Sequence, residues 1–417
     1  MPIVGSSSLL RHRDFQRLWA AATVSQLGTR ISELALPLVA ILALSANAFQ
    51  IGLIDAAAAV PFLLVGLPAG AWIDRLRRRP VMIVSDLARG LCLLSIPVAY
   101  VAGLLSIGLL LAVSFIVGTF VLFFNVAYQA YLPSLVGEAR LVDGSSKLEI
   151  SASGAAITGP TIAGGLVAAI GAPFAVLFDS ISYFVSGLLI WSIRQAEPAP
   201  QTAAPAARRS LRAEIIEGVR YVLVDTRLRA IAASVALTNL WLAVIFAVLL
   251  LYLVRDLGLN AATIGLAFGV GNIGWLVGAS LGERIPRRFG VGSTIVGSAA
   301  LFGVPMLAIA FAPHGTEVAV LIGGWALFGL VVVVNNVNQV SYRQAITPPG
   351  MRGRMNASMQ FINQGTIPIG AILGGILGTT VGLHTTLVIG AVGLVFAFVP
   401  LVASPVRSAA IPADSPV

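Results

Sequence analysis

About twelve apolar stretches, each long enough to cross a membrane as a helix, constrain this chain more than any other feature of its sequence. A helix of roughly twenty apolar residues spans a hydrocarbon core of about 30 Å. Because lipid offers the backbone no hydrogen-bond partners, only helices and closed barrels span it, and the alternating pattern of barrel strands is absent here. We therefore predict an all-α integral membrane protein with twelve transmembrane helices. The expected spans are residues 18–44, 51–73, 81–100, 105–128, 150–169, 173–193, 230–253, 261–282, 291–312, 317–340, 356–380 and 383–404.

Charge is scarce in this sequence and lies in alternate loops. Charged residues make up 10% of the 417 residues and hydrophobic residues 58%, far from the composition of a soluble domain. The formal net charge is +9, and the loop arginines fall before the first expected span or in every second loop after it, with Arg255 as the exception. The positive-inside rule then predicts an even number of spans in the cell membrane, with both termini cytoplasmic. The basic excess is thus a topology signal, and no nucleic-acid partner is expected.

Residue types that carry chemistry in enzymes are sparse. Cys92 is the only cysteine, and the three histidines lie far apart, so neither a disulfide nor a metal site is expected. The sequence has no G-x-x-x-x-G-K-S/T loop for ATP, and no span contains H-E-x-x-H or a nucleophile–base spacing. We therefore expect no catalytic residue, no cofactor and no enzymatic activity. The first apolar run is too long for a cleaved signal peptide, and we keep it as a spanning helix.

The chain divides into two halves. Residues 195–213 are rich in Pro, Ala and Arg, which predicts a linker between two sets of six spans. Apolar residues are interspersed with charges over 214–229, which predicts an amphipathic helix on the membrane surface. We expect a first six-helix bundle over 1–194, a cytoplasmic linker with that helix over 195–229, and a second bundle with a short tail over 230–417.

Two short motifs recur in the two halves. "DRLRRR" from Asp74 recurs as "ERIPRR" from Glu283, and "QAYLP" from Gln129 recurs as "QAITP" from Gln344. Parallel six-helix repeats place a binding cavity between the halves near the middle of the bilayer. The repeated acid–arginine pattern predicts a cytoplasmic gate, although the arginines alone would also anchor the topology. The expected gate comprises Gly70, Asp74, Arg75, Arg78, Arg79, the structural pair Asp86 and Arg89, and Glu283, Arg284, Arg287 and Arg288.

The first of these loops resembles a family signature. The run "GAWIDRLRRR", which begins at Gly70 and ends at Arg79, resembles the loop signature G-x-x-x-D-R-x-G-R-R/K of the major facilitator superfamily, with Arg77 in place of the second glycine. In that family the acid and the arginines latch the two halves together on the cytoplasmic side. The resemblance implies the same role for the gate residues of this chain.

The fifth span carries a second motif of this superfamily. The run "GAAITGPTIAGG" over 154–165 resembles the antiporter signature G-P-x-x-G-G, with Ala163 in place of the first glycine. Pro160 removes a backbone donor and kinks the helix, while Gly159, Gly164 and Gly165 permit close packing. The alternative is that glycine and proline are simply common in spanning helices.

Four longer runs narrow the resemblance to one branch. "SQLGTRISELALP", "FNVAYQAYLP", "FDSISYF" and "RQAITPPGMRGRMNAS" resemble the macrolide-efflux and siderophore-exporter branch of the drug:proton antiporters, although Thr29 stands where relatives often carry an acid. The resemblance implies a monomer that exports hydrophobic or amphiphilic small molecules by proton antiport with alternating access. An importer or a lysophospholipid flippase of the same fold remains an alternative, as does a membrane sensor or scaffold that transports nothing.

Charged side chains within the expected spans need a reason to be there, because each costs at least about 2.5–3.5 kcal/mol at a helix centre. Gln26, Arg30 and Glu33 form one stripe of the first helix, where Glu33 is either a proton carrier tuned by burial and by Arg30 or half of a permanent ion pair. Asp179 shares a face with Ser182 and has no cation on its own helix. It is therefore the other candidate proton carrier, or else a hydrogen bond that packs two helices.

Amides among apolar side chains suit an amphiphilic organic solute rather than a bare ion, although they also serve as packing hydrogen bonds. Those of the second half share faces of the tenth and eleventh spans. The candidates for the substrate cavity are Gln26, Asn125, Tyr128, Asn239, Asn335, Asn338, Gln339, Gln360, Asn363 and Gln364.

Overall fold

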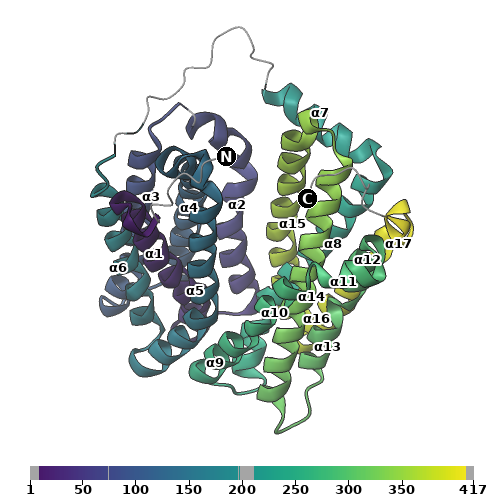
Figure 1. The fold of residues 1–417 in the computed structure, drawn as a ribbon. Coiled ribbons are helices and arrows are strands. Elements are labelled where there is room, and N and C mark those ends of the chain that lie inside the picture. Colours follow the sequence, from purple (N-terminus) through teal and green to yellow (C-terminus); the bar gives the residue numbers. More distant parts are fainter. Residues whose placement is uncertain (1–8, 74, 196, 198–210, 410–417) are drawn as a thin grey trace. The chain divides into compact units, whose positions relative to one another are not determined.

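The computed structural model describes residues 9–73, 75–195, 197 and 211–409, and it confirms the twelve-span helical fold (Figure 1). Its contacts divide the chain into two compact units, the first made of residues 1–45 and 64–203, the second of residues 46–63 and 204–417. The second expected span is therefore shared between the units. The expected domain boundaries at residues 194 and 230 remain a prediction.

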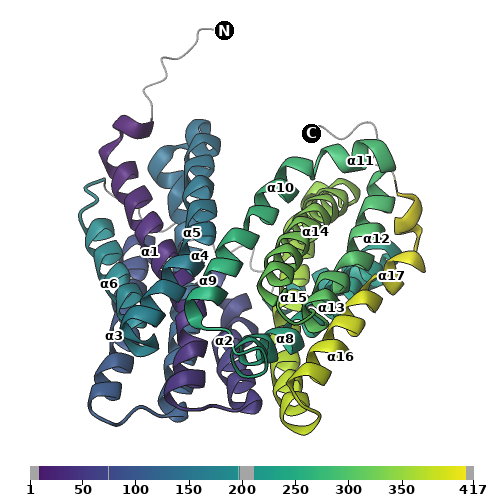
Figure 2. The same ribbon diagram turned by 90° about the horizontal axis from the view of Figure 1, so that it is seen from below.

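The first unit is built from long helices. It contains α1 (Arg13–Leu38), a π-helical turn (Val39–Ala43), the part of α2 (Ala48–Ile73) from Leu64 onward, α3 (Arg78–Val101), α4 (Ile107–Val136), α5 (Leu141–Ile170) and α6 (Ala172–Trp191), with 3-10 turns at Leu9–Arg11 and Glu138–Arg140. In Figures 1 and 2, α1 lies against α5 and α6, and α3 lies against α4 and α6. Buried side chains of α1, α4 and α6, among them Phe15, Tyr131 and Ile190, form one apolar core.

The second unit contains more, shorter helices. Besides the part of α2 up to Leu63, they are α7 (Leu211–Val224), α8 (Thr226–Arg255), α9 (Ala261–Gly271), α10 (Ile273–Leu281), α11 (Arg284–Phe289), α12 (Val291–Leu301), α13 (Gly303–Ala310), α14 (Glu317–Ile346), α15 (Arg352–Thr380), α16 (Leu383–Val395) and α17 (Val399–Val402), with 3-10 turns at Pro349–Met351, Phe396–Phe398 and Pro405–Ser408. The eighth, ninth and twelfth spans are thus each divided into two helices. Within this unit α8 packs on α15 and α16, and α14 packs on α9, α10, α12 and α13.

The ends of the helices follow local sequence rules. Asp225 Oδ1 accepts the backbone N–H groups of Arg227 and Leu228 at 2.8 and 3.0 Å, which caps the start of α8. Gly137 and Gly171 have φ angles of 77° and 85°, a left-handed conformation that glycine adopts easily, and they end α4 and α5. These residues therefore define where α8 begins and where α4 and α5 end.

The helices extend beyond several predicted spans. Helix α4 ends at Val136 rather than at residue 128, and α5 begins at Leu141 rather than at residue 150. The spans were placed by hydropathy, and a helix can continue into polar sequence once it has left the hydrocarbon layer. The difference matters because the polar residues of these extra turns belong to the candidate site.

The predicted amphipathic helix forms as α7 and packs on the start of α15. Glu217 and Arg354 form an ion pair of 2.8 Å between the two helices, and Val222 is fully buried. A Cβ on Gly218 would lie 2.9 Å from the Arg354 carbonyl oxygen, so glycine permits this close approach. Its position on a membrane surface remains a prediction.

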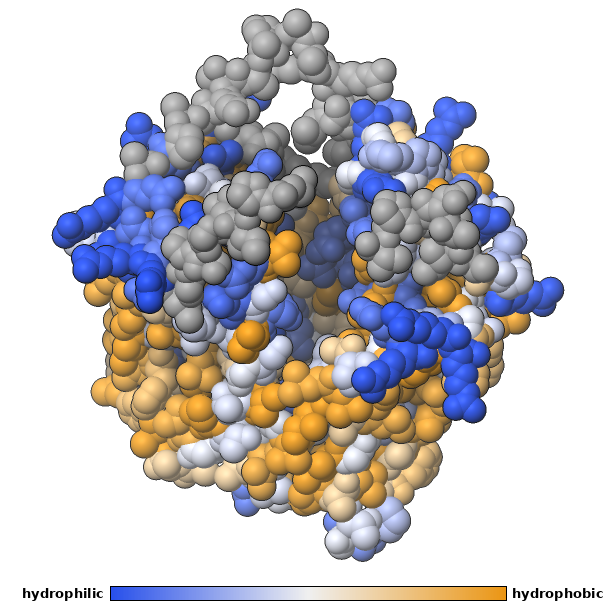
Figure 3. Space-filling view, in the orientation of Figure 1, coloured by the Kyte–Doolittle hydropathy of each residue, from blue (hydrophilic) through white to orange (hydrophobic). Residues whose placement is uncertain are grey.

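The surface of each unit suits a lipid environment. Figure 3 shows hydrophobic residues over the flanks of each unit and hydrophilic residues gathered mainly toward one end. Many large apolar side chains are exposed, among them Leu64, Val98 and Leu188 at 64%, 59% and 62%. Such exposure would be costly in water and is expected of residues that face lipid tails.

Candidate functional site

A buried ion pair lies inside the first unit. Asp86 and Arg89, one turn apart on α3, form an ion pair whose side chains are 0% and 4% exposed. Ser186 on α6 donates a hydrogen bond of 2.7 Å to Asp86 Oδ2. The Arg89 guanidinium carbon lies 4.5 Å from the ring centroid of Phe124 and 4.1 Å from that of Tyr183. Both charges therefore have partners in place of water, as a buried pair requires.

Tyr183 connects this pair to α1, and Asp179 lies on the same helix as Tyr183. Its hydroxyl lies 2.9 Å from Thr29 Oγ1, at a distance where either hydroxyl can donate. Asp179, one turn earlier on α6, is 1% exposed. Ser182 Oγ lies 3.1 Å from Asp179 Oδ1 and 2.8 Å from its carbonyl oxygen. Among the residues that the structure describes, no basic nitrogen lies within 4.0 Å of this carboxyl group.

Gly28 allows α1 to reach Asp179. A Cβ at this position would overlap the Asp179 carboxyl group and the Ser182 side chain. The backbone of α1 therefore forms one wall around Asp179, and the buried Ser32 hydroxyl lies beside it. Asp179 is enclosed by hydroxyl groups and backbone, with the Arg89 charge further away.

The predicted pair of Arg30 and Glu33 forms, with 2.7 Å between Arg30 Nη1 and Glu33 Oε2. Of the two interpretations of Glu33, the ion pair is the one that this geometry favours, because the Arg30 and Glu33 side chains are 43% and 52% exposed and not buried. The stem of Arg30 packs on α5, where a Cβ at Gly159 would overlap it. Glu33 on α1 is thus an accessible acid that is paired with Arg30.

The antiporter motif of α5 divides into packed and open positions. Gly159 contacts Arg30, and Gly164 is buried, as close packing predicts. A Cβ at Gly165 would meet no atom within 4 Å, so the expectation of close packing was wrong there. Pro160 lies inside α5, which continues past it to Ile170.

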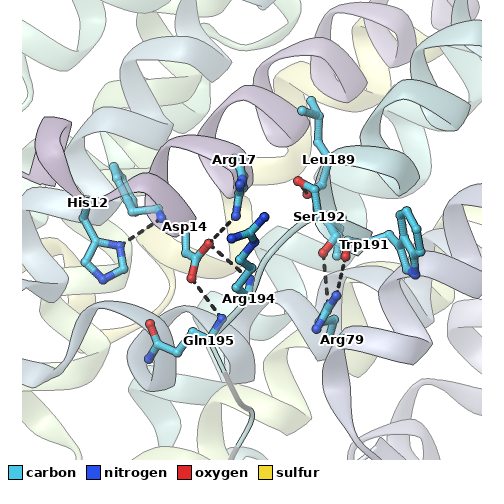
Figure 4. A network of polar contacts seen from close by, with 11 residues as sticks. His12, Asp14, Arg17, Arg79, Leu189, Trp191, Ser192, Arg194 and Gln195 are labelled. Atoms are coloured by element: carbon cyan, nitrogen blue, oxygen red, sulfur yellow. Dashed lines mark hydrogen bonds and ion pairs between the residues drawn. The ribbon is translucent and has the colours of Figure 1, made fainter.

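A polar network ties the start of α1 to the chain that leaves α6 (Figure 4). Asp14 Oδ1 accepts hydrogen bonds from Arg17 Nη1 at 2.7 Å and from the Arg194 backbone N–H at 3.2 Å. Asp14 Oδ2 accepts the Gln195 backbone N–H at 2.9 Å. Gln195 Nε2 donates to the carbonyl oxygen of Ser134, near the end of α4, at 3.3 Å. Three helices therefore meet at the first residues of the linker.

Arg79 and Glu197 join α3 to the same segment. Arg79 donates from Nε to the Ile190 carbonyl oxygen at 3.1 Å and from Nη2 to that of Trp191, two carbonyl groups at the end of α6 (Figure 4). Glu197 accepts the backbone N–H of Arg78 at 2.6 Å and that of Arg79 at 3.2 Å, which caps the start of α3. We call the contacts of Asp14, Arg79, Gln195 and Glu197 the linker clamp.

The remaining gate residues show little direct pairing. Asp74 lies outside the described residues, Gly70 lies within α2, and Arg75 is exposed. In the second unit, Glu283 and Arg287 form an ion pair of 3.7 Å with both side chains 80% exposed. Pairs exposed to this degree contribute little stability, so any role of these residues must come from another conformation or partner. Arg284 and Arg288 are exposed as well.

Two amides of α14 make hydrogen bonds to neighbouring helices, as expected if these amides serve helix packing. Asn335 Nδ2 donates to the Ile295 carbonyl oxygen at 2.9 Å and to Ser298 Oγ at 3.0 Å, and Asn338 Nδ2 donates to the Gly282 carbonyl oxygen at 2.9 Å. Each of these asparagines is 5% exposed. Their role in a substrate cavity remains a prediction, as it does for the buried Gln339, the exposed Asn125 and Gln360, and the half-buried Asn239, Asn363 and Gln364.

A cavity of about 340 Å³ opens in the first unit between α1, α4 and α5. Two predicted cavity residues, Gln26 and Tyr128, line it together with Gln129, Ser145, Glu149 and the apolar side chains of Leu132, Pro133, Leu141, Leu148 and Ala152. The sequence argument named neither Ser145 nor Glu149, because both lie in the extra turns of α5 before the predicted span. The structure thus places two of the predicted residues beside an acid that hydropathy had assigned to a loop.

The comparisons with known proteins identify the family. Residues 4–415 match the model of a family described as "Transmembrane secretion effector". The chain belongs to this family of major facilitator transporters. The resemblance in its motifs is therefore confirmed, and the protein is a multi-pass membrane transporter rather than an enzyme.

Relatives of this transporter include two exporters. The chain is 28% identical over 381 residues to the multidrug efflux pump Tap of Mycolicibacterium fortuitum, covering 88% of this chain and 90% of Tap. It is 26% identical over 396 residues to the enterobactin exporter EntS of Shigella boydii, covering 90% and 88% of the two chains. These relatives support a drug or siderophore exporter.

Solved structures agree on the fold alone. A bacterial homologue of the iron transporter ferroportin matches with a TM-score of 0.72 at 19% identity, over 95% of this chain and 99% of that one. The nucleoside transporter NupG matches with a TM-score of 0.74 at 14% identity, over 93% and 99%.

Asp14, Tyr183, Glu149 and Glu197 were not predicted as site residues. Asp14 and Glu197 lie outside the spans expected from the sequence, and only the fold brings them to backbone N–H groups more than a hundred residues away. Tyr183 carried a usable signal, because it lies four residues after Asp179 and so shares its helix face.

Proposed function

We propose that this transporter exports hydrophobic or amphiphilic small molecules from the cell in exchange for protons, by alternating access. The efflux activities named for Tap and EntS support the direction. The alternating arginine-rich loops support a position in the cell membrane with both termini in the cytoplasm. We expect a monomer to carry out the whole cycle.

The main support for proton coupling is the burial of the Asp179 carboxyl group. This carboxyl group is buried among hydroxyl groups, whereas Asp86 has Arg89 and Glu33 has Arg30 as direct partners. An acid without a direct cation can bind and release a proton as its surroundings open to one side or the other. The Arg89 charge, which lies against the ring of Tyr183 one turn along α6, would stabilise the carboxylate when the proton leaves. We therefore assign the proton to Asp179 ahead of Glu33.

The test is transport in vesicles with an imposed pH gradient. In antiport, protons move from the acidic to the alkaline compartment, so solute must accumulate on the acidic side. The purified protein is reconstituted and screened against a panel of antibiotics, siderophores and lipids. We expect at least one solute to accumulate in this direction and the pH dependence to vanish in Asp179→Asn.

The controls separate coupling from folding. Asp256→Asn removes an exposed acid after α8 and should transport normally. Glu33→Gln should retain gradient-driven transport. Normal coupling in Asp179→Asn would refute the assignment, and failure of every solute to move would favour a sensor or scaffold that transports nothing.

A further inference from the structure

We propose that the cavity between α1, α4 and α5 binds the positively charged, N–H-bearing head group of the transported solute, with Glu149 as its counter-ion. The inference rests on the proposed export function and narrows its substrate class to amphiphiles with a primary ammonium or guanidinium group. It concerns the cavity lined by Gln26, Tyr128, Ser145 and Glu149.

The carboxylate of Glu149 has no cationic partner among the residues that the structure describes. Among the described residues, Glu149 forms no ion pair within 4.0 Å. Lys147, two residues earlier, points its ammonium group at Asp143, with 3.2 Å between Nζ and Oδ1. A carboxylate at the wall of a cavity with no cation beside it attracts a cationic ligand.

Two residues that line this cavity each carry a buried polar atom without a partner in the described part of the chain. Gln26 Oε1 and the Tyr128 hydroxyl make no hydrogen bond to any residue that the structure describes. Leaving such an atom unpaired costs about 1–3 kcal/mol, so an observed case needs an explanation. Together with the Glu149 carboxylate they form a set of acceptors, and a ligand with several N–H donors would satisfy it.

The aromatic and apolar walls suit the rest of an amphiphile. The ring of Tyr128 stacks on that of Phe124, with ring centroids 6.0 Å apart and an angle of 13° between the ring planes. An aromatic face attracts a cation at short range. The side chains of Leu132, Leu141 and Leu148 complete the lining and offer apolar contact to a hydrocarbon body.

The walls of the cavity are held in place from the opposite face of α5. Trp19 Nε1 donates to the Lys147 carbonyl oxygen at 3.2 Å and to Ser151 Oγ at 2.8 Å. Thr23 Oγ1 donates to Ser151 Oγ at 2.9 Å. These bonds fix α1 against α5 on both sides of Glu149 in sequence, so the carboxylate is presented from a rigid element.

Direct binding of a matched pair of probes tests the proposal. Dansylcadaverine carries a primary ammonium group, and its N-acetyl derivative keeps the same body without the charge. Each is titrated against the full-length protein in phosphatidylcholine nanodiscs, and fluorescence gives Kd. We expect the ammonium probe to bind at least about tenfold more tightly, the effect of one charge-assisted hydrogen bond.

Variants assign the selectivity to this cavity. Glu149→Gln should weaken binding of the ammonium probe about tenfold and leave the acetylated probe unchanged. Tyr128→Phe keeps the ring and should produce a smaller loss. Glu138→Gln is the matched control, since it removes an exposed acid just before α5 that does not line the cavity.

The outcomes are distinct from those of the transport test. Equal binding of the two probes, no binding of either, or an equal loss in Glu149→Gln and Glu138→Gln would overturn the cavity proposal. If the selectivity depends on Glu149 but no pH gradient drives transport, the cavity stands and proton antiport fails. If a pH gradient drives transport but Glu149→Gln binds the ammonium probe normally, proton antiport stands and the cavity proposal fails.

Discussion

At the scale of single residues, the Asp86–Arg89 pair shows how this chain accommodates charge within its helices. Each charge has several partners, so the loss of one side chain leaves the other buried and unmatched. Measurements on buried pairs show that breaking one costs about 3–5 kcal/mol, while replacing both partners is far less costly. The pair therefore constrains which substitutions the first unit tolerates.

We predict that Arg89→Gln lowers the free energy of unfolding by about 3 kcal/mol, because Asp86 is left buried without its cation. The double variant Asp86→Asn with Arg89→Gln should recover at least half of that loss. Thermal denaturation of the purified variants in detergent measures both. Arg284→Gln, at an exposed position, is the control and should change nothing. A double variant less stable than Arg89→Gln would contradict the pairing argument.

The sequence showed part of this site and not the rest. The spacing of Asp86 and Arg89 on one helix was enough to predict their pairing. Ser186 and Phe124 became partners only through the packing of α3 on α6 and α4, which no local pattern encodes. The exposure of Glu33 was missed for the same reason, since depth along a helix does not say which face is covered.

At the scale of elements, the linker clamp turns the end of the first bundle into a junction of helix termini. Glu197 accepts backbone N–H groups at the start of α3, and Arg79 donates to carbonyl groups at the end of α6. Both arrangements place charge where the helix dipole favours it. The loop of the family signature enters α3 directly at this junction.

We predict that Glu197→Gln frees the first turn of α3. Replacing the carboxylate weakens a cap worth about 1 kcal/mol or more, so the backbone amides of Arg78 and Arg79 should exchange hydrogen several-fold faster. Hydrogen exchange with mass spectrometry measures this directly. Glu138→Gln, in the turn between α4 and α5, should leave α3 unchanged. Unaltered exchange in Glu197→Gln would show that the cap does not hold α3.

The elements themselves were well predicted because hydropathy is a local property. All twelve spans appear, although their ends moved where polar turns continue a helix. The division of the ninth span at Phe302 has a local cause, since Pro305 cannot donate a backbone hydrogen bond one turn back. The division of the eighth span at Asn272 depends on packing, for Asn272 Oδ1 accepts the indole N–H of Trp325 from α14 at 2.8 Å.

At the scale of the whole molecule, the distribution of arginine among the loops predicts the membrane topology of all twelve spans. If both termini are cytoplasmic, the loops after odd-numbered spans lie outside and those after even-numbered spans lie inside. Leu104, after α3, and His314, after α13, should then be extracellular, whereas Arg77 and Arg287 should be cytoplasmic.

The single native cysteine makes this prediction accessible to labelling. In a Cys92→Ser background, we expect cysteines introduced by Leu104→Cys and His314→Cys to react with a membrane-impermeant maleimide in intact cells. Those introduced by Arg77→Cys and Arg287→Cys should react only after the membrane is permeabilised. Because the four positions come from both units, an inverted or odd-numbered topology would change the labels in a recognisable pattern. Labelling of Arg77→Cys in intact cells would place the signature loop outside, and a cytoplasmic gate would then be impossible.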